Sequence, residues 1–94
     1  MKMHMQEKRK ILKSYKKNKI EIKQNTSNKQ NLIKINKEIE DAIDKVKNQD
    51  ERIALRYVYI DENIKTQEEA ADKANFSFKY FQKILSNGVK HIKL

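Results

Sequence analysis

The chain has 94 residues, a formal net charge of +9, hydrophobic and charged fractions of 37% each, and no cysteine or proline. A chain of this length supports one small folded unit with an appended helix or arm, and it excludes an enzyme-sized core. Without cysteine, disulfide bonds and thiolate metal sites are excluded, so a reducing cytosol is the expected compartment.

The composition also predicts the fold class. Proline is absent and Gly88 is the single glycine, whereas hairpins and β-turns require more of both, so we expect an all-α protein. No apolar run reaches the length of a signal peptide or a membrane span. We therefore expect a protein that is made and kept in the cytoplasm, with no membrane partner.

The positive charge is concentrated near the two ends of the chain. Residues 1–23 carry nine Lys or Arg against two Glu, and residues 75–94 carry four lysines and no acid. Lysines near phosphates release condensed counterions and add salt-sensitive affinity. This asymmetry favours a polyanionic partner, but it does not distinguish DNA from RNA or from an anionic membrane surface.

Residues 1–49 are expected to form a basic segment of two helices, at about 5–23 and 29–49, joined by a polar loop at 25–28. In the first helix a thin apolar stripe lies in a lysine-rich surround. This suits either a solvated helix docked on the second helix or an arm that lies on phosphates. The lysines that would contact a nucleic-acid backbone are Lys16, Lys17 and Lys19.

The second of these helices has apolar residues at alternating steps of three and four, a spacing typical of a buried seam. The pattern covers little more than two heptads, which is fewer than a coiled coil needs, so packing on the first helix and formation of a homodimer both stay open. The seam residues are Leu32, Ile35, Ile39 and Val46.

The segment from Asp50 to Ile60 begins with an acidic turn that suits the helix dipole and then becomes strongly apolar. We expect it to be the most buried helix of the C-terminal half, with Arg52 and Arg56 on a solvated ridge. The polar run 61–63 predicts a loop before the next helix.

The stretch 66–85, TQEEAADKANFSFKYFQKIL, predicts two short helices joined by a tight turn. Thr66 and Glu69 have capping-box spacing, in which the Thr66 hydroxyl accepts from the Glu69 amide while the Glu69 carboxylate reaches back. Asn75 suits a left-handed turn and Ser77 is a good N-cap. Small residues on one face of the first helix let the second cross closely. They are Ala70, Ala71 and Ala74.

The second helix of this stretch has two distinct sides. Phe81, Ile84 and Leu85 recur at the helical period and are predicted core residues. The opposite side is predicted to face a partner and carries Phe78, Lys79, Gln82, Lys83 and Ser86. The run 86–88, which ends in Gly88, predicts a helix end or kink.

Taken together, ERIALRYVYI, TQEEAADKANFSFKYFQKIL and VKHIKL resemble region 4 of bacterial sigma-70 factors, the module that reads promoter −35 elements. The same module occurs in small phage regulators of the ArpU and RinA type, which place a helical segment before it. The resemblance covers residues 50–93, about half of the chain. It implies that residues 50–94 form a helix-turn-helix DNA-binding domain after a helical hairpin at 1–49.

The resemblance also implies a role for individual residues. The motif core would consist of Ala71, Ala74, Phe76, Phe81 and Ile84, and the base-reading set of Ser77, Phe78, Lys79, Gln82 and Lys83. Contacts to the DNA backbone would come from Thr66, Ser86, Lys90 and Lys93. Three positions depart from the family pattern. Ala74 is smaller than usual, Phe78 replaces a polar residue or Arg, and Gly88 interrupts a helix that typically continues.

These features predict a non-enzymatic, sequence-specific double-stranded DNA-binding transcriptional regulator from a phage or mobile element, located at the nucleoid, with the helix 77–86 in the major groove. RNA polymerase is a candidate second partner. One alternative is a phage assembly or interaction module, such as a small terminase subunit or a polymerase-binding protein; another is a helical RNA-binding protein. No cofactor or metal is expected, because His4 and His91 lie at opposite ends of the chain without a spaced carboxylate pair.

Overall fold

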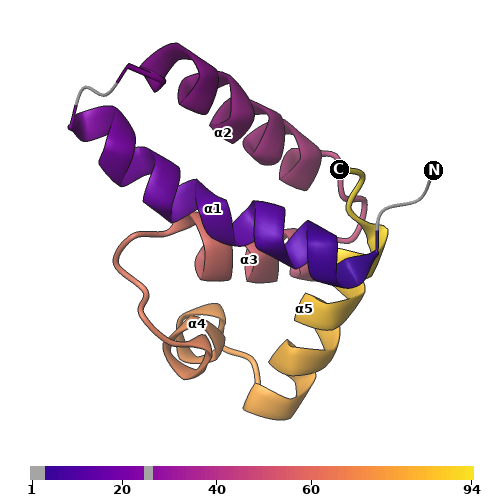
Figure 1. Ribbon diagram of the computed structural model, residues 1–94. Helices are drawn as coiled ribbons and strands as arrows, with labels where there is room; N and C mark the ends of the chain where they lie inside the picture. The colour runs from indigo at the N-terminus through magenta and orange to yellow at the C-terminus, as the bar shows by residue number, and fades with distance from the viewer. Residues whose placement is uncertain (1–3, 25–26) are drawn as a thin grey trace.

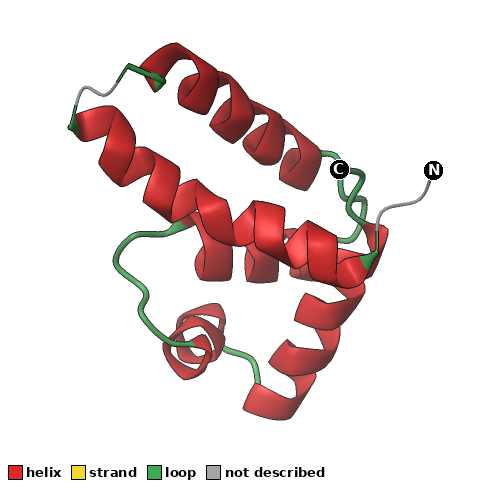
Figure 2. Cartoon of the chain, viewed as in Figure 1, coloured by secondary structure: helices red, strands yellow, loops and turns green. Residues whose placement is uncertain are grey.

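The computed structural model describes residues 4–24 and 27–94, and this part of the chain is all-α, as predicted (Figures 1 and 2). Two residues of the predicted loop, Asn25 and Thr26, lie outside the described residues. The helical elements are, in order, α1 (Met5–Lys23), α2 (Lys29–Asp44), α3 (Gln49–Leu55), the π-helix η1 (Arg56–Ile60), α4 (Gln67–Ala74) and α5 (Phe78–His91).

The helices α1 and α2 form an antiparallel hairpin, which confirms the predicted helical N-terminal segment (Figure 1). The hairpin buries a polar pair as well as apolar side chains. Asn18 Nδ2 donates to Asn36 Oδ1 at 2.9 Å, and Asn36 Nδ2 donates to the Tyr15 carbonyl oxygen at 3.1 Å. Because both amides are buried, these bonds satisfy groups that would be costly to leave without partners.

The end of α2 differs from the prediction, because the helix stops at Asp44 and not near residue 49. A separate helix, α3, begins after a short loop: the Asn48 side chain accepts from the Glu51 amide at 3.1 Å and caps its N-terminus. Arg52 stabilises the junction by donating to the Val46 carbonyl oxygen at 2.6 Å. The expectation of a solvated ridge was therefore wrong for Arg52, which ties α3 to the loop that precedes it.

From α3 the chain continues without interruption into the π-helix η1, which closes when the Asp61 amide donates to the Arg56 carbonyl oxygen at 2.9 Å. Arg56 itself forms an exposed ion pair with Asp44 at 2.9 Å. A π-helical turn takes one residue more than an α-helical turn, so it changes which side chains face the core. The buried residues of this continuous segment are Glu51, Ala54, Leu55 and Tyr59.

The helix α4 begins at a side-chain cap, in which the Thr66 hydroxyl accepts from the Glu69 amide at 3.1 Å. The second half of the predicted capping box is displaced by one residue, because the Glu69 carboxylate accepts from the Lys65 amide at 3.4 Å. Both bonds satisfy donors near the helix start, where no intrahelical partner exists.

The turn between α4 and α5 is held by a left-handed residue. Asn75 has φ 62° and ψ 37° and is the residue with positive φ in the described chain. The Phe76 amide then donates to the Ala71 carbonyl oxygen at 3.0 Å, which satisfies the end of α4. Ser77 caps α5 by accepting from the Tyr80 amide at 3.3 Å. These contacts fix how α5 leaves the turn.

The predicted helix end or kink at residues 86–88 was wrong, because α5 runs through Gly88 to His91. The glycine serves a different purpose. A Cβ atom at Gly88 would lie 3.1 Å from Leu55 Cγ and 3.4 Å from Glu51 Cβ, so its absence lets α5 cross α3 closely. Gly88 therefore permits close packing of α5 on α3 and does not end the helix.

The buried apolar residues form a continuous core cluster to which every helical element contributes. Within it, α1 contacts α2 along one side and η1 and α5 along the other. The largest fully buried side chains are Tyr15, Phe81, Leu12, Ile39, Ile43, Leu55, Ile92 and Val89. None of the described helices combines the length and the apolar composition that a membrane crossing requires.

Candidate nucleic-acid interface

The two sides of α5 have opposite character. Phe81, Ile84 and Leu85 are buried against the rest of the core, together with Val89. The five residues of the predicted base-reading set are all exposed: Ser77, Phe78, Lys79, Gln82 and Lys83. Because they lie at helical spacing, they present two ammonium groups and one amide to solvent on a common side.

Of the aromatic residues around the start of α5, Phe76 and Tyr80 contact each other, although Tyr80 is also exposed. Phe76 packs edge-on against Tyr80, with ring centroids 5.2 Å apart, and the Tyr80 hydroxyl donates to Asp50 at 2.6 Å. That hydrogen bond raises the pKa of Tyr80. Phe78 is 41% exposed and takes no part in this aromatic contact. Its ring is therefore accessible to a partner.

The other motif residues lie where the turn requires small or apolar groups. Ala71 is buried, whereas Ala74 and Phe76 are half-buried beside the turn. Small side chains at this place allow α4 and α5 to approach.

The predicted backbone-contacting residues lie in three places: on α1, at the C-terminal end of α5, and at the start of α4, where Thr66 is exposed. Lys90 and Lys93 are exposed near the C-terminal end of α5, and Ser86 is half-buried. Lys8 joins this end, because its ammonium group donates to the Lys90 carbonyl oxygen at 2.9 Å. The N-terminal turns of α1 and the C-terminal end of α5 therefore form one basic region.

The three lysines predicted on α1 are not equivalent. Lys17 is exposed, whereas the Lys19 ammonium group lies 5.7 Å from the centre of the Tyr15 ring. Lys16 donates to the Ile64 carbonyl oxygen at 3.2 Å and so ties α1 to the loop before α4. An ammonium group has three donors, so Lys16 can hold the loop and still face a ligand.

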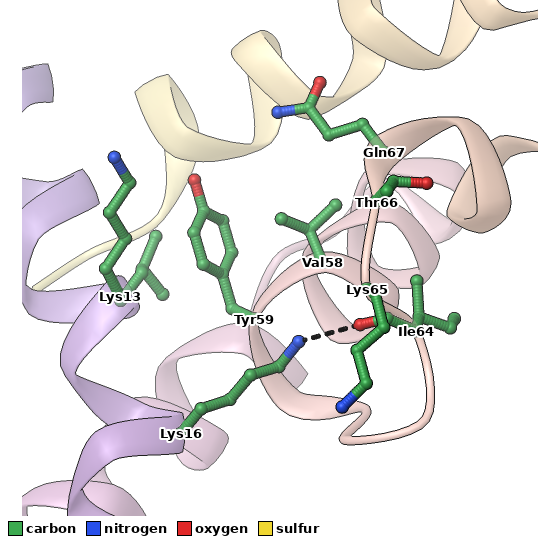
Figure 3. Close-up of a pocket in the computed structure, with 9 residues that line it drawn as sticks. Lys13, Lys16, Val58, Tyr59, Ile64, Lys65, Thr66 and Gln67 are labelled. Atoms are coloured by element: carbon green, nitrogen blue, oxygen red, sulfur yellow. Dashed lines mark hydrogen bonds between the residues drawn. The ribbon is translucent and has the colours of Figure 1, made fainter.

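A pocket of about 290 Å³ opens between α1, η1 and the start of α4 (Figure 3). Of the residues that the structure describes, three lysines and no acidic residue line it, and the tyrosine among them, Tyr59, is only 7% exposed. Sequence reasoning missed Tyr59 and Lys13 in this pocket. The available signal was the spacing of Arg9, Lys13 and Lys16, which places them on one face of α1.

A second and larger cavity of about 550 Å³ lies at the C-terminal end of α5, beside the connection between α2 and α3. There the buried carboxylate of Glu51 lies 2.8 Å from His91 Nδ1, an ion pair when the imidazole is protonated. Lysines from two segments line the same cavity: Lys45 and Lys47 from the α2–α3 connection, and Lys93 after α5. Among the described residues, no group of three or more His, Cys, Asp or Glu side chains is arranged to hold a metal ion.

These features define a small all-α protein with an exposed basic helix and a lysine-lined pocket beside it. The family described as "Protein of unknown function (DUF1492)" matches residues 6–93, so the chain belongs to this family. No curated protein and no solved structure gives a significant match.

Proposed function

We propose that this protein is a sequence-specific double-stranded DNA-binding transcriptional regulator that inserts residues 77–86 into the major groove. The observation that carries this proposal is the division of α5 into a buried apolar side and an exposed polar, basic side. The left-handed turn at Asn75 and the buried alanines of α4 support it, since such features are typical of a helix-turn-helix.

The chemistry of the exposed side suits base recognition. Gln82 can pair bidentately with adenine, and Lys79 or Lys83 can donate to guanine or to a phosphate. The exposed ring of Phe78 suits contact with a thymine methyl group. Lys90 and Lys93 add contacts to the backbone that depend little on sequence. The resemblance to sigma-70 region 4 and to ArpU and RinA regulators adds a phage or mobile-element origin and a nucleoid location to the proposal.

Selection of bound duplexes from a random pool tests the proposal. We expect an enriched motif, and a Gln82→Ala variant should relax the preference at one base pair by about 1–3 kcal/mol. Lys90→Ala should weaken binding to all sequences and reduce the salt slope by about one. Lys34→Ala, which removes an exposed charge from α2, is the matched control. Failure to bind any duplex at low salt would refute the proposal, and preference for structured RNA in competition would favour RNA binding.

A second function, as an assembly or interaction module, is favoured by exposed apolar side chains on the helical hairpin. Ile20 of α1 is 58% exposed and Ile33 of α2 is 41% exposed. Of the four predicted seam residues, Ile39 and Val46 are buried in the core of the single chain, and Leu32 and Ile35 are half-buried. A homodimer through this face would use Leu32 and Ile35 with the exposed isoleucines. Light scattering at high micromolar concentration separates a dimer from a monomer.

A further inference from the structure

The pocket between α1, η1 and α4 contains a hydroxyl group that the fold itself does not use. Tyr59 is more than nine-tenths buried, yet its hydroxyl makes no hydrogen bond to any residue in the described ranges. Figure 3 shows the ring between Lys13 of α1 and Gln67 of α4, with the hydroxyl directed into the space among them. A buried hydroxyl without a partner is costly, so a polar ligand is the expected occupant.

The charge around this hydroxyl determines the sign of that ligand. Lys13, Lys16 and Lys65 line the pocket, and among the described residues no acidic side chain does. The Lys65 ammonium group donates to the Glu62 carbonyl oxygen at 3.2 Å, so the positive charge of the pocket comes from Lys13 and Lys16. Burial raises the pKa of Tyr59, and the positive charge of nearby Arg9 opposes that shift. The hydroxyl is therefore a neutral donor among cations at physiological pH, which suits an anion.

The start of α4 completes the donor set. Thr66 and Gln67 line the pocket, and the Thr66 hydroxyl caps the Glu69 amide but not the amides of Gln67 and Glu68. Free amides at a helix N-terminus point along a dipole that favours a negative group. The Glu69 carboxylate is engaged by the Lys65 amide, and neither glutamate of this turn lines the pocket.

We propose that this pocket binds a phosphate group of the DNA backbone, held by the Tyr59 hydroxyl, the Lys13 and Lys16 ammonium groups and the first amides of α4. The inference rests on the proposed function and extends it, because it gives one backbone phosphate a defined site shared by α1, η1 and α4. Lys16 already fixes the loop through the Ile64 carbonyl oxygen, so the site exists before the ligand arrives. A bound phosphate would lock α1, η1 and α4 in their relative positions.

The first experiment uses Tyr59→Phe, with Tyr57→Phe as the matched control that removes a hydroxyl from the same element outside the pocket. Inorganic phosphate is titrated at constant ionic strength against chloride, and the amide shifts of Gln67 and Glu68 are followed by NMR. We expect saturable shifts in the wild type and in Tyr57→Phe, and roughly tenfold weaker binding in Tyr59→Phe, the loss of one hydrogen bond to a charged group.

The thermal midpoint of the same variants separates a ligand role from a structural one. Because the Tyr59 hydroxyl has no partner within the described residues, its removal should leave the midpoint unchanged or raise it. A lowered midpoint together with unchanged phosphate affinity would overturn the proposal.

The second experiment measures duplex binding as a function of salt for Lys13→Gln and for the control Lys34→Gln. Lys13→Gln should weaken binding to all sequences and reduce the salt slope by about one, whereas Lys34→Gln should match the wild type. If the wild type binds duplex and both variants behave alike, the pocket assignment fails while the proposed function stands. If phosphate binds at Gln67 but no duplex binds at all, the proposed function fails, and with it the assignment of the phosphate to DNA.

Discussion

Among single residues, Tyr15 combines burial with several electrostatic contacts. Its ring lies in the core, its carbonyl oxygen accepts from Asn36, and Lys19 lies over its face. Burial, followed by the effect of the Glu40 carboxylate, raises the pKa of Tyr15 from 10.0 to about 12. The folded state therefore favours the neutral phenol more strongly than the unfolded state does.

This shift predicts a loss of stability in alkali. The contribution of the neutral phenol is fully present below pH 10.0, the ordinary pKa, and is lost as the pH rises towards about 12, because the unfolded state releases the proton first. Urea unfolding between these limits should show a falling midpoint for the wild type. A Tyr15→Phe variant has no phenol to titrate and should fall less steeply. Parallel curves for the two proteins would contradict the assignment.

Among the elements, the hairpin of α1 and α2 is specified by more than its apolar stripe. The stripe alone allows the two helices to slide, whereas the Asn18–Asn36 hydrogen bond at 2.9 Å is made in one register. The best-established role of buried polar pairs is to fix the register in which two helices pair.

An Asn36→Ala variant tests this contact. It leaves the buried Asn18 amide with only the Ser14 hydroxyl at 3.5 Å as an acceptor, so we expect a loss of about 1–3 kcal/mol in the free energy of unfolding. Asn31→Ala, at an exposed position of the same helix, should change stability by less than about 0.5 kcal/mol. In the double variant Asn18→Ala with Asn36→Ala, the two losses should be less than additive, because both remove the same bond. Full additivity would show that the amides do not cooperate.

Across the whole molecule, the predicted parts 1–49 and 50–94 share one core. Leu12 and Tyr15 of α1 belong to the same cluster as Tyr59, Phe81 and other residues of the C-terminal half. The elements α3, η1 and α4 have seven, five and eight residues, which is too short to be stable as isolated helices. Their stability therefore depends on packing, including the cover that α1 provides.

A fragment of residues 50–94 should consequently fold poorly by itself. We expect a circular dichroism signal at 222 nm that is weak per residue and melts without a sharp transition, whereas the full chain should unfold cooperatively. Adding a separate peptide of residues 1–49 should restore part of the signal, because it supplies the missing core residues. A fragment that is fully helical and melts cooperatively would instead support two independent domains.

The amino-acid sequence by itself determined the helical class, the extent of α1, the caps at Thr66 and Ser77 and the left-handed turn at Asn75. These features depend on the helical period and on hydrogen bonds from side chains to nearby backbone groups. Both involve residues only three or four positions apart, so the local sequence is enough to predict them. The exposed and buried sides of α5 follow from the same local spacing. Whether that exposed side binds DNA stays a proposal.

Only the tertiary structure decided how Gly88 and Arg52 pack and where Tyr59 lies. Gly88 looked like a helix end because glycine commonly ends helices, but a Cβ at this position would lie only 3.1 Å from Leu55 Cγ. Arg52 donates to the Val46 carbonyl oxygen in the loop before α3, and Tyr59 lies beside Lys13 and Lys16 of α1. Such contacts join residues that are distant in the chain or separated by a turn, so no local spacing encodes them.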